Sequence, residues 1–133
     1  MEKFSIAVDS ANAFVRIKLT GLLTLADVAE FANAQLAAYG KLASVQGRHR
    51  TLCDVSECKI QLQEVVHAFR QLLADEQLMS SQLAFVVGKS PARMQIRRLI
   101  LRDSCRFFDT VAEAERWLQS GAIAAAPEPQ VVA

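Results

Sequence analysis

Two short runs in which apolar and polar residues alternate restrict the fold of this chain more than any other sequence feature. Their apolar positions are every second residue, namely Phe4, Ile6 and Val8 in the first run and Val15, Ile17 and Leu19 in the second. This period is typical of strands with one buried face, and residues 9–13 between the runs include turn-forming Asp, Ser and Asn. The pattern therefore predicts an antiparallel hairpin over residues 4–19.

Apolar residues at helical spacing follow the hairpin. Thr24 and Asp27 have nearly the pattern of a capping box, and Gly40 stands where a helix commonly ends. The stripe expected to face the core consists of Leu25, Val28, Ala32, Leu36 and Tyr39. The spacing therefore predicts a helix that ends at Gly40.

Strand and helix patterns then alternate. Residues 51–55 form a short apolar strand pattern, entered from a polar loop at residues 46–50. The helix expected after it has a buried stripe made of Leu62, Val65, Val66, Phe69, Leu72 and Leu73. Residues 83–87 are continuously apolar, which predicts a strand buried on both faces.

Capping signals mark the last two helices. Ser90 and Pro91 have the residue types favoured at the start of a helix, so a third helix is expected from there. Residues 105–108 are a last short strand, and a capping box at Thr110 and Glu113 opens a final helix through Leu118. Trp117 shares a stripe with Val111, Ala114 and Leu118, so its side chain is expected to be largely buried.

The predicted order is β-β-α-β-α-β-α-β-α, an α/β fold in a single domain. Strands that alternate with helices imply crossovers onto a mostly parallel sheet, here of five strands, to which the N-terminal hairpin adds one antiparallel strand. Residues 1–120 form this domain. Residues 121–133 contain one charge, two prolines and a run of alanines, and are expected to be a disordered tail.

Composition excludes several protein classes. A length of 133 residues fits one domain, and 52% hydrophobic with 22% charged residues excludes a disordered or collagen-like chain. The net charge of +1 gives no overall field toward nucleic acid or membrane. No secretory signal or membrane-spanning run is recognisable, and three cysteines without a C-x-x-C spacing indicate reduced thiols. We therefore predict a cytoplasmic protein.

Three motifs make the chain similar to the SpoIIAA-like family. They are Gly21-Leu22-Leu23-Thr24, Leu52-Cys53-Asp54-Val55-Ser56, and Phe108-x-Thr110-x-x-Glu113-Ala114-x-x-Trp117-Leu118. The resemblance covers roughly residues 4 to 119. It implies a fold shared with STAS domains and, more remotely, with CRAL-TRIO lipid carriers, and a binding or regulatory role without catalysis.

The resemblance is incomplete at the position of the regulatory serine. STAS anti-anti-sigma factors have a phosphorylatable serine in an Asp-Ser-Ser-Gly stretch just after a strand that ends in Asp-x-Ser. The Asp-x-Ser is present here as Asp54-Val55-Ser56, but residues 57–61 contain neither serine nor glycine. The phosphoserine switch is therefore not expected in this chain.

Reactive side chains are few, and most have a structural explanation. His67 is expected at the edge of the core or in solvent, and His49 in a solvated loop. Cys53 and Cys58 are expected to be structural thiols, since neither has the spacing of zinc ligands. Asp54 follows a parallel strand, where α/β folds place ligands, so it is a candidate crevice residue as well as a candidate cap. We predict no catalytic residue, metal or cofactor.

Charge is uneven only around the third helix. Residues 89–106 include six basic residues and one acid, whereas the rest of the chain has nine basic and thirteen acidic residues. Helical geometry places Ala92, Ile96, Leu99 and Ile100 toward the sheet. It leaves a surface on the other side that is a candidate interaction or anion-binding site: Arg93, Met94, Arg97, Arg98, Leu101 and Arg102. A simply solvated helix with extended arginines is the alternative.

These features give three hypotheses about function. The first is a non-enzymatic module that binds a protein partner, or a second copy of itself, through the third helix. The second is a carrier of a small apolar or amphipathic, lipid-like molecule whose anionic group meets the arginines. An enzyme that uses Asp54 and a cysteine ranks last. Nucleic acid is not expected to bind, because no recognition motif or aromatic platform is present.

Overall fold

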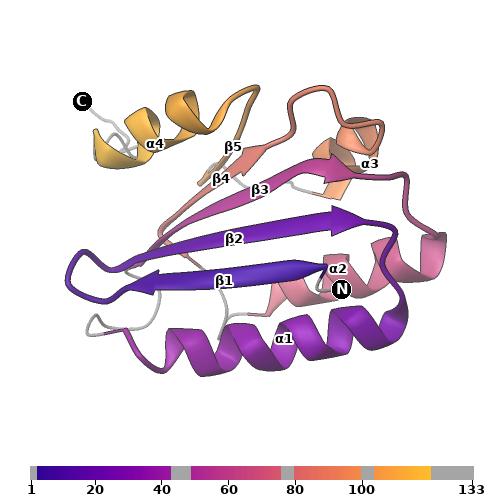
Figure 1. Ribbon diagram of the computed structural model, residues 1–133, viewed down its shortest axis with the longest axis horizontal. Helices are drawn as coiled ribbons and strands as arrows, with labels where there is room; N and C mark the ends of the chain where they lie inside the picture. The colour runs from indigo at the N-terminus through magenta and orange to yellow at the C-terminus, as the bar shows by residue number, and fades with distance from the viewer. Residues whose placement is uncertain (1–2, 43–48, 76–79, 100–103, 121–133) are drawn as a thin grey trace.

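The structure is a computed structural model that describes residues 3–42, 49–75, 80–99 and 104–120 (Figure 1). Its strands are β1 (Phe4–Asp9), β2 (Phe14–Gly21), β3 (Arg50–Cys58), β4 (Gln82–Val86) and β5 (Cys105–Phe108). Its helices are α1 (Leu25–Tyr39), α2 (Gln63–Ala74), α3 (Arg93–Leu99) and α4 (Val111–Gln119). Within the described ranges, every helix is too short or too polar to cross a bilayer. The expected tail at residues 121–133 lies outside the described residues.

All five strands form one sheet in the order of the sequence. β1 pairs with β2 antiparallel, with Phe4 opposite Leu19, and every later neighbour is parallel. The connections from β2 to β3, from β3 to β4 and from β4 to β5 all lead to the next strand in the same direction across the sheet. Because such crossovers are right-handed, the three connecting helices lie on the same face of the sheet. The predicted α/β class, element order and mixed five-stranded sheet are confirmed.

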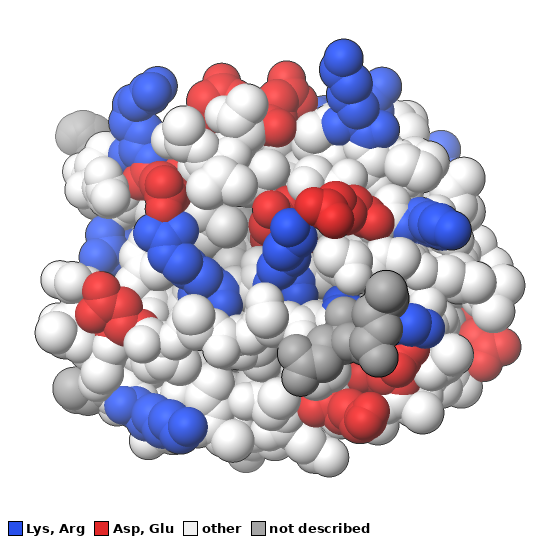
Figure 2. Space-filling model, viewed as in Figure 1, with Lys and Arg blue, Asp and Glu red and all other residues white. Residues whose placement is uncertain are grey.

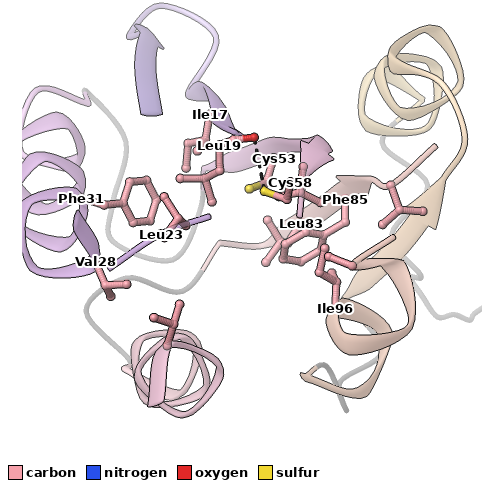
Figure 3. Close-up of a cluster of buried hydrophobic side chains, with 14 of the residues drawn as sticks. Ile17, Leu19, Leu23, Val28, Phe31, Cys53, Cys58, Leu83, Phe85 and Ile96 are labelled. Carbon is pink, nitrogen blue, oxygen red and sulfur yellow. Dashed lines mark hydrogen bonds between the residues drawn. The ribbon is translucent and has the colours of Figure 1, made fainter. Parts of the chain in front are cut away.

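The two faces of the sheet are covered unequally. On one face, α1, α2 and α3 enclose the main core, where Val15, Cys53 and Phe85 meet Phe31 and Ile96 (Figure 3). On the other face a single helix, α4, covers a smaller cluster. That cluster consists of Phe14, Leu52, Ala84, Val86, Ala114 and Leu118. Figure 1 shows α1 and α2 below the sheet and α4 above it.

The face of α1 that is buried differs from the predicted stripe. Leu25 and Leu36 are exposed, whereas Val28, Phe31, Gln35 and Ala38 are buried. The helix is turned so that the Phe31 ring packs between Phe4 at 5.5 Å and Phe69 at 6.2 Å, measured between ring centroids. Contacts between aromatic rings stabilise this orientation beyond the burial of apolar area alone.

Three smaller predictions also need correction. β3 is longer than expected and runs on to Cys58, where Lys59 N donates to Gly21 O. Leu62 lies before α2 as its exposed N-cap residue rather than on the buried stripe. Trp117 is only half-buried, because Ala114 and Leu118 face the sheet while Trp117 lies at the margin beside Phe108.

Candidate functional site

The predicted surface of the third helix is present in α3. Arg93, Met94, Arg97 and Arg98 are exposed, and Ile96 is buried against the sheet as expected. Leu101 and Arg102, the other members of the predicted surface, lie outside the described residues, as does Ile100. The described part of the surface therefore consists of one apolar side chain among three arginines.

The start of α3 is fixed to the carboxyl end of β3. Ser90 Oγ donates to Cys58 O at 2.8 Å and accepts from Ala92 N at 3.0 Å. Gly88, at the turn before it, has φ of +50°, a conformation that favours glycine. These contacts hold the base of α3 at the edge of the sheet where the parallel strands end.

Gln61 connects three segments at this edge. Its Oε1 accepts from Leu23 N at 2.9 Å, and its Nε2 donates to Gly21 O and Lys59 O. Its backbone forms a reciprocal pair with the side chain of Gln95 in α3, at 2.8 Å and 2.9 Å. The loops after β2 and β3 are therefore fixed beside α3. Sequence patterns gave no sign of this arrangement, since Gln61 and Gln95 are 34 residues apart.

Four exposed apolar residues belong to the segments that the Gln61 contacts join, and we call them the apolar patch. It consists of Leu22, Ile60, Leu62 and Met94, whose side chains are 45–60% exposed. Each is next in sequence to Gln61 or to one of the residues bonded to it. Of these four residues, only Met94 was predicted to belong to an exposed surface. The apolar residues on either side of Gln61, Ile60 and Leu62, were the local sign of two others.

Basic residues lie on the same loops and on α3, and we call them the basic rim. Lys59, Lys89, Arg93 and Arg98 are exposed and have no ion pair among the described residues. Arg97 differs, because its guanidinium lies 5.4 Å from the centre of the Phe107 ring. The chain outside residues 89–106 has more acidic than basic residues, and Figure 2 shows side chains of both signs interspersed on the face that it views. The positive excess is therefore local to this edge.

Asp54 does not lie in a crevice at the strand end. It is inside β3, and its Oδ1 accepts from Ser56 N at 3.0 Å and from Ser56 Oγ at 2.6 Å. Its neighbour Leu52 belongs to the cluster under α4, and alternation along the strand puts Asp54 on that same face. Asp54 therefore makes local hydrogen bonds to Ser56 within β3 and does not cap a helix.

Cys53 and Cys58 are buried thiols. Burial raises the pKa of Cys53 far above its ordinary value and that of Cys58 to about 12. Cys58 Sγ also donates to Leu19 O at 3.4 Å (Figure 3). Both side chains are therefore protonated at neutral pH, the unreactive state of a thiol. Within the described residues, no three metal-ligating side chains of the His, Cys, Asp and Glu types gather.

The prediction of a solvated loop at His49 is wrong. His49 is only 2% exposed, its ring lies 4.2 Å from that of Tyr39, and its Nε2 is 3.0 Å from Ser80 Oγ. Burial lowers the pKa of His49, because the charged imidazolium would lose its hydration. His67, by contrast, is exposed on α2.

The burial of His49 predicts a dependence of stability on pH. Its pKa is lower in the folded state than the ordinary value of 6.5, so below pH 6.5 the unfolded chain binds more protons. The free energy of unfolding should therefore fall as pH decreases from 6.5, with a slope of at most about 1.4 kcal/mol per pH unit. Chemical denaturation between pH 7.5 and about 5 measures it.

Two variants test whether His49 causes this dependence of stability on pH. His49→Gln should remove most of the slope, because glutamine does not titrate, whereas His67→Gln should keep it. A slope that survives in His49→Gln would show that another group is responsible. Hydrogen bonds lower the pKa values of Asp9 and Asp27 from the ordinary value of 3.8. Their contribution to stability is therefore lost only below about pH 3.8, which is outside the range measured here.

A cavity lies on the main-core side of the sheet, between the strands and α1, α2 and α3. Its volume is about 90 Å³. Its walls are mostly apolar, and they include Phe31, Phe69, Phe85 and Ile96. The α3 arginines and Asp54 are not among the described residues that line it. The structure therefore does not bring the cavity and the predicted anion-binding residues together.

Comparison with known proteins supports the fold and does not address the role of the sheet edge beside α3. No protein-family model and no curated protein matches the sequence. Among solved structures, an uncharacterised protein of the DUF3478 family with a SpoIIAA-like fold, from Shewanella loihica PV-4, matches with a TM-score of 0.66. The match covers 89% of this chain and 95% of that one at 14% identity. Nothing in these comparisons supports the remote similarity to CRAL-TRIO carriers.

Proposed function

We propose that this chain, which has a SpoIIAA-like fold, is a non-enzymatic cytoplasmic module that binds an acidic surface of another protein. The contact is made by the apolar patch and the basic rim. The single observation that carries the proposal is the set of four exposed apolar side chains held together by the hydrogen bonds of Gln61 and Gln95. A central apolar group within a polar border is the usual layout of a protein interface.

The fixed backbone of the apolar patch favours a protein partner. Five hydrogen bonds between Gln61 and its neighbours hold the patch before any partner arrives, so little conformational entropy is lost on binding. Burial of Ile60 or Met94 would contribute about 1.5–3 kcal/mol each. Methionine and arginine are also enriched at protein interfaces. Charged residues at the border of an interface, such as lysine, mainly increase the rate of association.

The positive charge of the basic rim favours an acidic partner over a second copy of this chain. A two-fold dimer through this surface would bring the same patch of each copy together, and with it Lys59 and Arg93 against like charges. Such like-charge contacts oppose association. A lipid surface is also disfavoured, because interfacial segments use Trp and Phe as anchors, and the apolar patch has no aromatic residue.

A photo-crosslinking amino acid at position 94 tests the proposal in cells. We expect an adduct with a different protein, joined through an acidic segment. The same group at position 36, which is exposed on α1, should give no such adduct and serves as the control. Three results would contradict the proposal. They are an adduct with a second copy of this chain, an adduct with lipid only, and the same set of adducts at positions 94 and 36.

Two surface variants separate the apolar and electrostatic contributions. Ile60→Ser with Met94→Ser, and Arg93→Glu with Arg98→Glu, should each abolish binding of the captured protein in purified form. Each should change the free energy of unfolding by no more than about 0.5 kcal/mol, since all four side chains are exposed. Binding by the wild type should weaken as salt rises, whereas binding that is insensitive to salt would contradict the role of the basic rim.

A further inference from the structure

β1 forms one edge of the sheet, and its outer side lacks the usual protection of an edge strand. It pairs with β2 without a bulge over all six of its residues. Residues 4–8 contain neither proline nor a charged side chain. Proteins commonly protect an edge with such residues, with a bulge or with a very short strand. The opposite edge, β5, has only four residues and includes Arg106, so β1 is the edge that is open to another strand.

The backbone groups on the outer side of β1 belong to Phe4, Ile6 and Val8. Thr20 N donates to Lys3 O at 2.9 Å, so Lys3 is in a hydrogen-bonded pair with the β2 side. In an antiparallel ladder such pairs occur at every second residue, which leaves the groups of Phe4, Ile6 and Val8 pointing away from the sheet. Among the described residues, no group outside the sheet bonds to the backbone of these three.

The outer side of β1 is complementary to a second copy of itself. In an antiparallel pair centred on Ile6, this residue lies opposite Ile6 of the second copy, and Phe4 lies opposite Val8. Only this centre gives every outward N–H and C=O group of the strand a partner. Residues opposite each other point to the same face, so the three half-buried apolar side chains of each copy all lie on the main-core face.

α1 runs along β1 and presents one of its sides at the same edge. Lys3 Nζ donates to Asp27 Oδ2 at 3.1 Å before β1, and Ser10 Oγ donates to Lys41 O at 3.1 Å after it. Figure 1 shows α1 below the sheet, parallel to β1. Helical spacing then defines a stripe on this side of α1 and the turn that follows it. The stripe consists of Asp27, Glu30, Ala34, Ala37 and Lys41.

This stripe is complementary to itself about the same two-fold axis. Ile6 and Ala34 each lie midway between the two contacts that join β1 to α1. Antiparallel copies of α1 that meet at Ala34 bring Lys41 of each copy beside Asp27 and Glu30 of the other. Glu30 and Lys41 are exposed and have no ion pair among the described residues. The small side chains at the centre of the stripe allow two helices to approach closely.

We propose that two copies of this chain pair through β1 and form a symmetric dimer with one continuous sheet. The backbone of β1 and the charged stripe of α1 have the same two-fold centre, which a strand from an unrelated protein would not match. The dimer goes beyond the proposed function and uses a different surface. α3 connects β4 and β5 at the far side of the sheet, so either proposal can fail without the other.

Sedimentation velocity and amide hydrogen exchange of the full chain test the dimer. We expect a reversible equilibrium between one chain and a species of twice its mass. Where about nine tenths of the chains are dimeric, the amides of Phe4, Ile6 and Val8 should exchange about tenfold more slowly than after dilution, because they gain acceptors. A single chain at every concentration up to that of an NMR sample would overturn the proposal. A dimer in which these three amides exchange as they do after dilution would also overturn it.

Charge reversals on α1 test the contact between the helices. Glu30→Lys and Lys41→Glu should each raise the dissociation constant of the dimer by about tenfold, since each change places like charges together at two symmetric positions. The double variant should recover most of the wild-type affinity. Glu64→Lys, on the exposed side of α2, is the control and should leave the dissociation constant unchanged. Single variants that dimerise as tightly as the wild type, or a double variant no tighter than either, would overturn the proposal.

Discussion

Replacement of Leu118 by alanine is expected to lower the free energy of unfolding by about 3 kcal/mol. Leu118 is fully buried, and it is the largest side chain that α4 inserts against Leu52, Ala84 and Val86. The resulting cavity cannot close easily. The N-terminus of α4 is fixed by the cap at Thr110, and Leu118 O accepts from the Arg50 side chain near the other end. Denaturation in urea measures the loss.

Leu36→Ala is the matched control for this prediction. The same atoms are removed from α1, but Leu36 is about half exposed, so the expected loss is below about 1 kcal/mol. The apolar spacing of the sequence predicts Leu36 to be buried, whereas the structure exposes it. Equal losses in the two variants would contradict the exposed position of Leu36 and would mean that α1 buries the stripe that the sequence pattern predicts.

Gln61→Ala is expected to lower the free energy of unfolding by about 2 kcal/mol, although no apolar core is disturbed. Truncation leaves Leu23 N without its partner in a half-buried setting, and Gly21 O keeps Lys59 N as its donor but loses Gln61 Nε2. The reciprocal backbone pair with Gln95 remains possible in the variant, but the loop after β2 is no longer fixed beside it. Denaturation in urea gives the size of the effect.

The second readout of Gln61→Ala is the apolar patch. Crosslinking through position 94 should decrease, because Leu22 and Ile60 are no longer held beside Met94. Gln63→Ala, two residues further on and exposed at the start of α2, should change neither stability nor crosslinking. A Gln61→Ala variant as stable as Gln63→Ala would show that these hydrogen bonds contribute little.

Much of the fold could be predicted because its signals are local. Alternation over residues 4–19 fixes the hairpin, the capping box at Thr24 is formed as expected, and the Thr110 side chain caps α4. Each of these signals lies within a few residues of the structure that it specifies. The element order then leaves few arrangements for a parallel sheet.

The site could be predicted only in part, because its contacts join distant residues. Met94 and its arginines were found from helical geometry alone. Ile60 joins them through Gln61 and Gln95, and His49 is buried by Tyr39 and Ser80, which no local pattern connects. The turn of α1 also depends on Phe4 and Phe69, which lie in other elements.

Because α4 alone covers the second face of the sheet and is synthesised last, this face is covered later than the other one. The ribosome completes all five strands and three helices by Phe108, and α4 follows about a second later at roughly 5–20 residues per second. Until then, Phe14, Leu52 and Val86 have no cover from α4. A chain that ends at Phe108 and has left the ribosome would therefore present an uncovered apolar sheet face to chaperones and to neighbouring chains, a surface that α4 covers in the complete fold.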